Sequence, residues 1–407
     1  MNVPFFISKR YLFSKKSRNV INLISGISVF GIFISTAAMV IVLSGFNGIE
    51  GLVTSLYSSF DPDIKITAQT GKTFSSDLVS KEKLLEIEGV EYVSNVIEEI
   101  SMVKNDDRWV TATMKGVEDD YLKMCDLGKL AKGKKELKDG NINKAIIGLG
   151  LQNQLLVSSN SELYSYVTVY GLLRNVKQSQ NNKEGFKPEA LSVGGVFNIN
   201  PEFDHKYFIV PIDFAEYVLE YGKDISSVEL GLKEGADHWK VKAEIETLLG
   251  NDFEVKTLYE QNELVFKTNE TEKWMVFLIL GFIMVLSTFN IIASLTMLIL
   301  DKKKDIKTLI SIGASRQFVG KIFVFEGLFI NLLGALSGLV IGLIFCLLQM
   351  KFKFIKLQNA AIDYWPVEIE ILDFVMIFGV IMAIAVISSY LPVKYLIKRH
   401  FKASFTG

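Results

Sequence analysis

Four long apolar stretches stand out from an otherwise mixed pattern of hydrophobic and polar residues. Residues 19–49, 274–300, 327–350 and 374–393 contain no charged side chain. A helix needs about 20 residues to cross roughly 30 Å of hydrocarbon, and each stretch meets this length. The pattern therefore predicts four transmembrane helices. The first stretch exceeds the about 7–15 apolar residues of a signal peptide, which disfavours that alternative.

Between the first two stretches the pattern changes to that of a mixed α/β domain. The segment "SSDLVSKEKLLEIEGV" predicts a Ser-capped helix that ends at Gly89, and "EYVSNVIEEISMVKN" and "RWVTATMKGV" predict two strands joined by a polar turn. A similar set of strands and helices returns before residue 262. The simplest organisation is a pair of βα-rich units that flank a strand-rich insert, residues 118–206.

The insert contains a long polar segment, "RNVKQSQNNKEGFKPEALSVGG", at residues 174–195. It is low in apolar residues and interrupted by Gly and Pro, which predicts a protruding loop. Long loops within compact domains tend to be functional or disordered, so a partner-binding role is one of two interpretations.

Basic residues cluster at three places beside the apolar stretches. They are Lys9, Arg10, Lys15, Lys16 and Arg18; Lys302, Lys303, Lys304, Lys307 and Arg316; and Lys394, Lys398, Arg399 and Lys402. The positive-inside rule predicts that these segments are cytoplasmic and that residues from about 50 to 270 lie outside. Three further lysines, Lys351, Lys353 and Lys356, weakly oppose this topology.

The short loop between the second and third stretches predicts an amphipathic helix. Ile306, Leu309, Ile310 and Gly313 follow i, i+3, i+4, i+7 spacing. Gly313 suits the left-handed position after a helix, and Ser315 suits the cap of the next one. Such a helix could be a connector lying on lipid or a docking element for a cytoplasmic protein.

The third stretch carries two further features. Gly334, Gly338 and Gly342 recur every four residues, which predicts close helix packing. Glu326 lies within the same helix, where a carboxylate is costly in lipid, so we expect it to face protein or water. Lys321 and Arg316 are candidate partners.

Composition narrows the class of protein. Hydrophobic residues make up 49% of the 407 residues, and the formal net charge is −1, so no basic excess points to nucleic acid. The two cysteines, Cys125 and Cys346, fall in different environments, and no metal-binding spacing occurs. The three histidines are scattered and no catalytic motif is present, so the sequence names no catalytic residue.

The chain resembles the FtsX/MacB-type ABC transporter permeases, and within them the LolC/LolE type of lipoprotein-releasing subunit. The resemblance rests on "FISKRYLFSKKSRNVINLISGISVFGI" with "VLSGFNG", on "AIIGLGLQNQL", on "DKKKDIKTLISIGAS" with the third stretch, and on "IDYWPVEIEILDF". It implies an integral membrane α-helical protein with four transmembrane helices and a large α/β periplasmic domain inserted between helices 1 and 2.

The resemblance also implies a domain organisation and a location. We expect a multi-pass protein of the bacterial inner membrane, with both termini cytoplasmic and the large domain periplasmic. The expected segments are an interfacial helix (1–18), helix 1 and its stalk (19–49), the periplasmic domain (50–270, with porter-like units 50–117 and 207–270), a stalk and helix 2 (271–300), the coupling helix (301–317), helix 3 (318–350), an outer loop (351–370), helix 4 (371–393) and a tail (394–407).

Partners follow from the same resemblance. They are a cytoplasmic ABC ATPase dimer, which would hold ATP and Mg, a second permease subunit, a periplasmic lipoprotein carrier and the lipoprotein cargo; the chain itself would bind no cofactor. The residues expected to contact the ATPase are Asp305, Ile306, Leu309, Ile310, Gly313 and Ala314. The carrier-binding residues expected in the polar loop are Arg174, Lys177, Phe186 and Pro188.

Two other functions remain open for such an architecture. One is a MacB-like efflux mechanotransmitter, and the other is an FtsX-like signalling permease that controls cell-wall hydrolases. A membrane-bound enzyme is a further alternative without any residue to support it.

Overall fold

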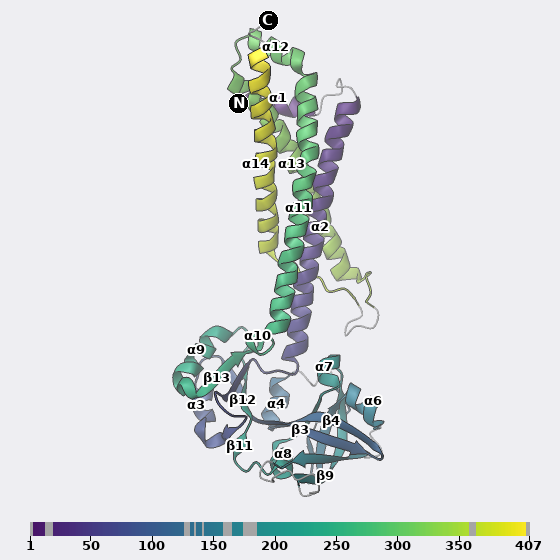
Figure 1. The fold of residues 1–407 in the computed structure, drawn as a ribbon, viewed down its shortest axis with the longest axis vertical. Helices are drawn as coiled ribbons and strands as arrows, with labels where there is room; N and C mark the ends of the chain where they lie inside the picture. Colours follow the sequence, from purple (N-terminus) through teal and green to yellow (C-terminus); the bar gives the residue numbers. More distant parts are fainter. Residues whose placement is uncertain are drawn as a thin grey trace. The chain divides into compact units, whose positions relative to one another are not determined.

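The chain folds into two compact units. The computed structural model describes residues 3–12, 19–125, 131–133, 136–140, 142–157, 165–173, 185–357 and 364–403. Met1–Leu52 and Lys267–Gly407 form one unit, here called the membrane unit, and Val53–Phe266 form the other, the external domain. The ribbon of each is drawn in Figure 1.

Four long helices and two short ones are described in the membrane unit. They are α1 (Val3–Leu12), α2 (Asn19–Ser58), α11 (Glu263–Asp301), α12 (Lys303–Ser311), α13 (Arg316–Phe352) and α14 (Ile371–Ala403). Within the described ranges four of them, α2, α11, α13 and α14, are long and apolar enough to cross a membrane. The predicted fold class, four such helices with an α/β domain between the first and second, is confirmed.

Strands and short helices alternate in the external domain. They are β1 (Ile64–Ala68), β2 (Phe74–Ser75), α3 (Lys81–Leu85), β3 (Val90–Asn105), β4 (Arg108–Val117), α4 (Asp119–Met124), β5 (Ala131–Gly133), β6 (Lys138–Asp139), β7 (Ile142–Gly148), α6 (Leu149–Leu155), β8 (Ser165–Leu172), β9 (Phe186–Phe197), α7 (Pro201–Asp204), β10 (Tyr207–Pro211), α8 (Ile212–Leu219), β11 (Asp224–Ile225), β12 (Ser227–Leu232), α9 (His238–Leu249), β13 (Phe253–Thr257) and α10 (Leu258–Gln261).

Six of these strands close into a ring. The order is β3, β4, β10, β7, β9 and β8, and β8 pairs again with β3. Closure is possible because β3 is 16 residues long, so its first half pairs with β12 and its last part pairs with β8 along the same edge. A closed ring leaves no free strand edge for unwanted pairing.

Three further strands extend from β3 as an open antiparallel sheet in the order β12, β1, β13. Of the others, β5 pairs with β9, β6 pairs with β7, and β2 pairs with β11. Helices α3 and α9 cover it, with Leu84, Val241 and Ile245 in the apolar core. Helix α3 is shorter than predicted: it is capped by Ser80, begins at Lys81 and ends at Leu85 instead of Gly89. The chain then turns through Gly89, whose φ of +103° suits glycine, to enter β3.

Two boundaries predicted for the insert differ from the structure. Residues 118–206 do not form a subdomain of their own, because their strands share the closed ring with β3, β4 and β10. The predicted loop 174–195 is also too long. Its second half belongs to β9, which pairs with β8 from Leu172↔Phe186 to Ser165↔Val193.

A cluster of buried charges lies inside the external domain. Lys115 of β4 and Glu229 of β12 are almost fully buried and form an ion pair at 3.1 Å. Lys65 of β1 lies 3.6 Å from Glu229 and 3.0 Å from Glu98 of β3, whose other oxygen accepts a hydrogen bond from Tyr207 at 3.0 Å. Each buried charge thus has an opposite charge beside it, as buried ions require.

Aromatic rings and the residues that follow α2 surround this cluster. The Lys115 ammonium lies 4.8 Å from the centre of the Phe60 ring, and the Tyr121 hydroxyl donates to the Phe60 carbonyl. The Asn262 amide donates to the Asp61 carboxylate at 2.9 Å. The residues that follow α2 and those that precede α11 are therefore tied to each other within the external domain.

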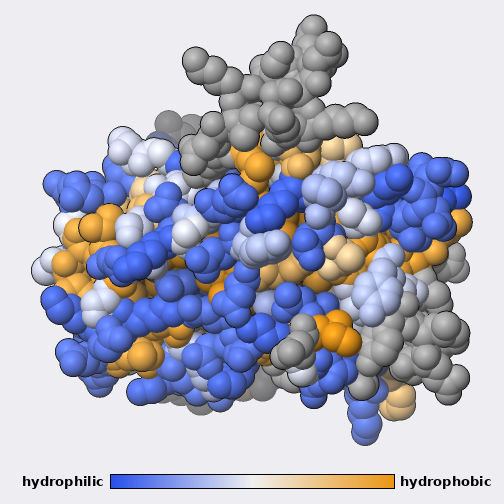
Figure 2. Space-filling view, turned by 90° about the horizontal axis from the view of Figure 1, so that it is seen from below, coloured by the Kyte–Doolittle hydropathy of each residue, from blue (hydrophilic) through white to orange (hydrophobic). Residues whose placement is uncertain are grey.

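One face of the external domain is shown in Figure 2. Hydrophilic residues predominate on it and hydrophobic residues occur in small separate patches. This distribution is typical of a surface exposed to water, and it contrasts with the apolar surfaces of the long helices.

Glu98 makes the stability of the external domain dependent on pH. Burial raises the pKa of this carboxyl, but Lys65 and Lys115 outweigh burial and lower the pKa from its ordinary value of 4.5 to about 2. A depressed folded-state pKa stabilises the fold above pH 4.5, and this contribution disappears as the pH falls toward 2. Glu98→Gln should therefore lower the free energy of unfolding by about 2–3 kcal/mol at pH 7 and by progressively less below pH 4.5.

Urea unfolding of residues 53–266 at several pH values measures this difference. Glu254→Gln is the matched control, because Glu254 forms an exposed ion pair with Lys256 and should contribute little. An equal effect of the two substitutions at every pH would contradict the interpretation.

Candidate functional site

The loop between α11 and α13 forms the amphipathic helix that its spacing predicts. Helix α12 runs from Lys303 to Ser311. Gly313 follows with a φ of +94°, and Ser315 caps α13 by accepting a hydrogen bond from the Phe318 amide at 3.2 Å. Two helices are thus joined by a compact turn.

The apolar face of α12 points inward. Ile306, Ile310 and Ala314 pack against the apolar core of the membrane unit. Among the residues expected to contact an ATPase, these three are therefore turned toward the chain itself. Asp305 and Gly313 are exposed, and Leu309 is half-buried.

Ile312 is 78% exposed, although it is not among the residues predicted from sequence to contact a partner. Its position does not fit the apolar spacing of α12. A large apolar residue outside that spacing, directly before Gly313, is the sequence signal that could have identified it. The outward surface available to a partner includes Asp305, Ile312 and Gly313, with the half-buried Leu309 and the exposed lysines Lys303, Lys304 and Lys307.

The glycines of α13 lie against α2. A Cβ atom at Gly334 would lie 2.8 Å from the Ile32 Cβ, one at Gly338 would lie 2.6 Å from the Thr36 Cβ, and one at Gly342 would lie 2.9 Å from the Val40 Cβ. Each glycine thus meets one residue of α2, at steps of four along both helices. Because the three glycines have no side chain, the backbone of α13 can lie directly against α2.

Glu326 is fully buried on α13 and faces protein. Among the described residues, neither of its carboxylate oxygens has a hydrogen-bond partner, and no ion pair joins it to Lys321 or Arg316. The adjacent Gly327 lies against Ser389 of α14 and Leu295 of α11. The position is therefore a meeting point of three helices, and the two cations suggested by sequence are not brought to it.

A strap on the outer side of the membrane unit, residues 364–370, crosses α2 at a second row of glycines. A Cβ at Gly45 would lie 2.9 Å from the Trp365 indole nitrogen, and one at Gly48 would lie 2.5 Å from the Pro366 carbonyl carbon. The Glu368 amide donates to the Ser44 carbonyl at 2.9 Å. The strap therefore contacts the backbone of α2 directly.

Buried polar side chains hold this strap. The Gln349 amide of α13 donates to the carbonyls of Ile355 and Trp365, and its oxygen accepts from the Ile355 amide. Asn47 of α2 donates to the Asp373 carboxylate of α14 at 2.7 Å, with both residues buried. In the sequence, Asn47 and the neighbouring glycines interrupt an apolar run, which is the local signal for this contact.

The structure places half of the predicted carrier-binding residues. Phe186 and Pro188 lie on β9, paired with Leu172 and Tyr170 of β8. Phe186 is 42% exposed. Arg174 and Lys177 lie outside the described residues. The described part of this region is thus a regular hairpin arm.

Among the described residues, no group of three or more His, Cys, Asp or Glu side chains is placed to hold a metal ion. The arrangement consists of an exposed face on α12, the closely packed helices α2 and α13, and a strap that joins α13 and α14 to α2.

Two protein families match different parts of the chain. Residues 25–248 match the MacB-like periplasmic core domain, and residues 277–401 match the FtsX-like permease C-terminal region. The first match covers more than half of the chain.

Curated relatives match along nearly the whole length. The lipoprotein-releasing system transmembrane protein LolE of Haemophilus influenzae is 24% identical over 417 aligned residues, which cover 96% of each chain. The lipoprotein-releasing system transmembrane protein LolC of Buchnera aphidicola is 25% identical over 409 aligned residues, which cover 97% of this chain and 96% of its own. The periplasmic region of MacB from Actinobacillus actinomycetemcomitans aligns with a TM-score of 0.35 and 12% identity, over 50% of this chain and 91% of its own.

The contact between α2 and α13 predicts a clear difference between two glycines. Gly338→Ala adds a methyl group that Thr36 and the backbone of α2 leave no room for, so it should lower the free energy of unfolding by about 1–3 kcal/mol. The midpoint of unfolding in mixed detergent and dodecyl sulfate micelles measures this.

Gly379→Ala on α14 is the matched control. No atom lies within 4 Å of the added methyl group, so helix propensity alone should leave the midpoint unchanged or raise it. Equal midpoints for the two variants would refute the close packing of α2 and α13.

Proposed function

Because the chain belongs to the family of FtsX/MacB-type ABC transporter permeases, of the LolC/LolE type, we propose that it is a permease subunit that releases lipoproteins from the bacterial inner membrane. The observation that carries this proposal is the match to proteins named for lipoprotein release along nearly their whole length. ATP hydrolysis by a separate cytoplasmic ATPase dimer, which holds ATP and Mg, supplies the energy.

Coupling begins at α12. In the proposed orientation the basic clusters beside α12 and at the end of α14 are cytoplasmic, in line with the positive-inside rule. The ATPase docks on the outward surface formed by Asp305, Leu309, Ile312 and Gly313. Support comes from the exposure of Ile312, because an apolar side chain 78% exposed at an aqueous boundary gains from being covered.

Movement then passes through α13 to α2. The turn at Gly313 joins α12 to α13, and α13 packs backbone to backbone against α2, so a displacement of α12 acts on both helices. Helix α2 continues without interruption to Ser58. A second permease subunit, either another copy or a related chain, completes the transporter, and lipoprotein cargo enters from the outer leaflet between the first and second membrane helices of the two subunits.

The periplasmic carrier docks on the arm formed by β8 and β9 together with the adjoining residues 174–184. Phe186 and Pro188 belong to this arm, and exposed aromatic side chains such as Phe186 are common in protein interfaces. The released lipoprotein passes to the carrier there.

Depletion of the protein tests the choice of cargo. Inner and outer membranes are separated after depletion, and the lipoproteins in each are counted. Accumulation in the inner membrane before growth stops is expected. A normal distribution accompanied by drug sensitivity would instead favour an efflux mechanotransmitter, and one accompanied by cell chaining would favour a signalling permease.

Two substitutions on α12 test the docking surface. Ile312→Asp should reduce recovery of the ATPase with the tagged permease by at least about tenfold, because it places a charge in a desolvated contact, while the stability of the chain stays unchanged. Ile306→Ala is the contrasting control, because Ile306 packs inward. It should lower the unfolding midpoint and leave ATPase recovery intact. The reverse pattern would show that the inward face, once released, is the docking surface.

A further inference from the structure

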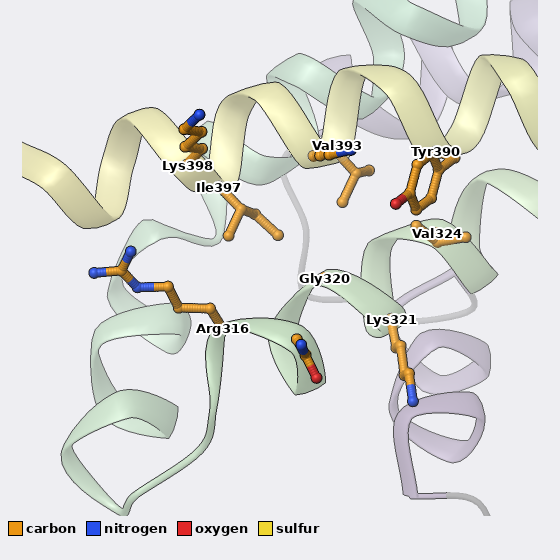
Figure 3. Close-up of a pocket in the computed structure, with 10 residues that line it drawn as sticks. Arg316, Gly320, Lys321, Val324, Tyr390, Val393, Ile397 and Lys398 are labelled. Atoms are coloured by element: carbon orange, nitrogen blue, oxygen red, sulfur yellow. The ribbon is translucent and has the colours of Figure 1, made fainter.

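A groove lies between the beginning of α13 and the end of α14. Its volume is about 470 Å³. The centre is apolar: Val393 and Ile397 of α14 point toward α13 at Gly320, and Tyr390 lies over Val324 (Figure 3). Gly320 lets α13 come close to α14 at this point, because a Cβ atom there would already be in contact with the Ile397 Cδ1, at 3.4 Å.

The rim of the groove is strongly basic. Arg316, Lys321, Lys394 and Lys398 all line it, and all four are exposed. Among the described lining residues none is acidic. The groove therefore combines a positive rim with an apolar centre.

The position of the groove along the helices matches a membrane surface. The charge-free run of α13 begins at Gly327 and that of α14 ends at Val393. The groove lies at this end of both runs, beside the charged residues that flank them. Tyr390 adds an aromatic ring with a polar tip, which favours the level of lipid headgroups.

We propose that this groove binds an anionic glycerophospholipid of the membrane leaflet in which it lies. The phosphate lies among the rim cations, and the upper part of an acyl chain lies along Val324, Val393 and Ile397. Basic pockets between membrane helices on the cytoplasmic side favour such headgroups. This site is separate from the path of the cargo and goes beyond the proposed function.

An acidic protein segment is the competing occupant, and the apolar centre argues against it. Four cations alone would suit an acidic peptide equally well. An apolar slot that opens at the rim beside a membrane span instead fits a ligand with a negative head and a hydrocarbon stem.

Lipid binding to the purified full-length chain tests the proposal. Native mass spectrometry compares the binding of phosphatidylglycerol with that of phosphatidylcholine of the same acyl chains. The chain should bind phosphatidylglycerol at least about fivefold more tightly, and Lys394→Gln with Lys398→Gln should reduce this preference to less than about twofold. The matched control, Lys351→Gln with Lys356→Gln, removes two exposed charges at the far end of α13 and should keep the preference.

A second variant tests the apolar centre. Gly320→Leu fills the slot while keeping all four cations, so it should weaken binding of phosphatidylglycerol without changing the net charge. The absence of a preference in the unaltered chain would overturn the proposal, as would equal losses in the two double variants. Retained lipid preference in Lys394→Gln with Lys398→Gln, together with lost recovery of the ATPase, would also overturn it and assign the groove to an acidic protein segment.

Discussion

Close contact of α2 with its neighbours is the constraint on which the membrane unit depends. In lipid there is no hydrophobic drive for helices to associate, so they are held by close packing and by buried polar contacts. Helix α2 receives the glycine face of α13, and its own glycines at 45 and 48 receive the strap. Because all these contacts are made at backbone distance, α13 cannot be displaced without moving α2.

Helix α2 is longer than the part of it that belongs to the membrane unit, because it continues beyond Leu52 to Ser58. It is a single helix of 40 residues, or about 60 Å, without a proline to bend it. Shortly after its end, the Phe60 ring lies 4.8 Å from the Lys115 ammonium, and the Asp61 carboxylate accepts a hydrogen bond from Asn262. A buried ion pair adds little net stability but tolerates few alternative arrangements, so we expect it to define the position of this chain segment rather than to strengthen the domain.

The sequence predicted what depends on local pattern and missed what depends on distant contacts. Charge-free runs identified the four spans, and Gly313 and Ser315 identified the turn after α12, because composition and capping act within a few residues. The second half of the predicted loop became β9 through pairing with β8, a distant contact. The inward orientation of Ile306 and Ile310 likewise depends on a core that other helices form. The residues next to Lys115 in the sequence do not indicate that it is buried with Glu229.

The groove and the docking helix share one structural element, and this links lipid binding to coupling. Ser315 caps α13, and the α13 side of the groove begins at the next residue, Arg316, so a shift of α12 must change the distance between Gly320 and Ile397 unless α14 follows. A ligand that favours one width of the groove favours the corresponding position of α12. If an ATPase binds at α12 as proposed, linkage requires that this binding change the lipid affinity of the groove by the same factor. Lipid composition would thereby influence the permease without any contact with the cargo.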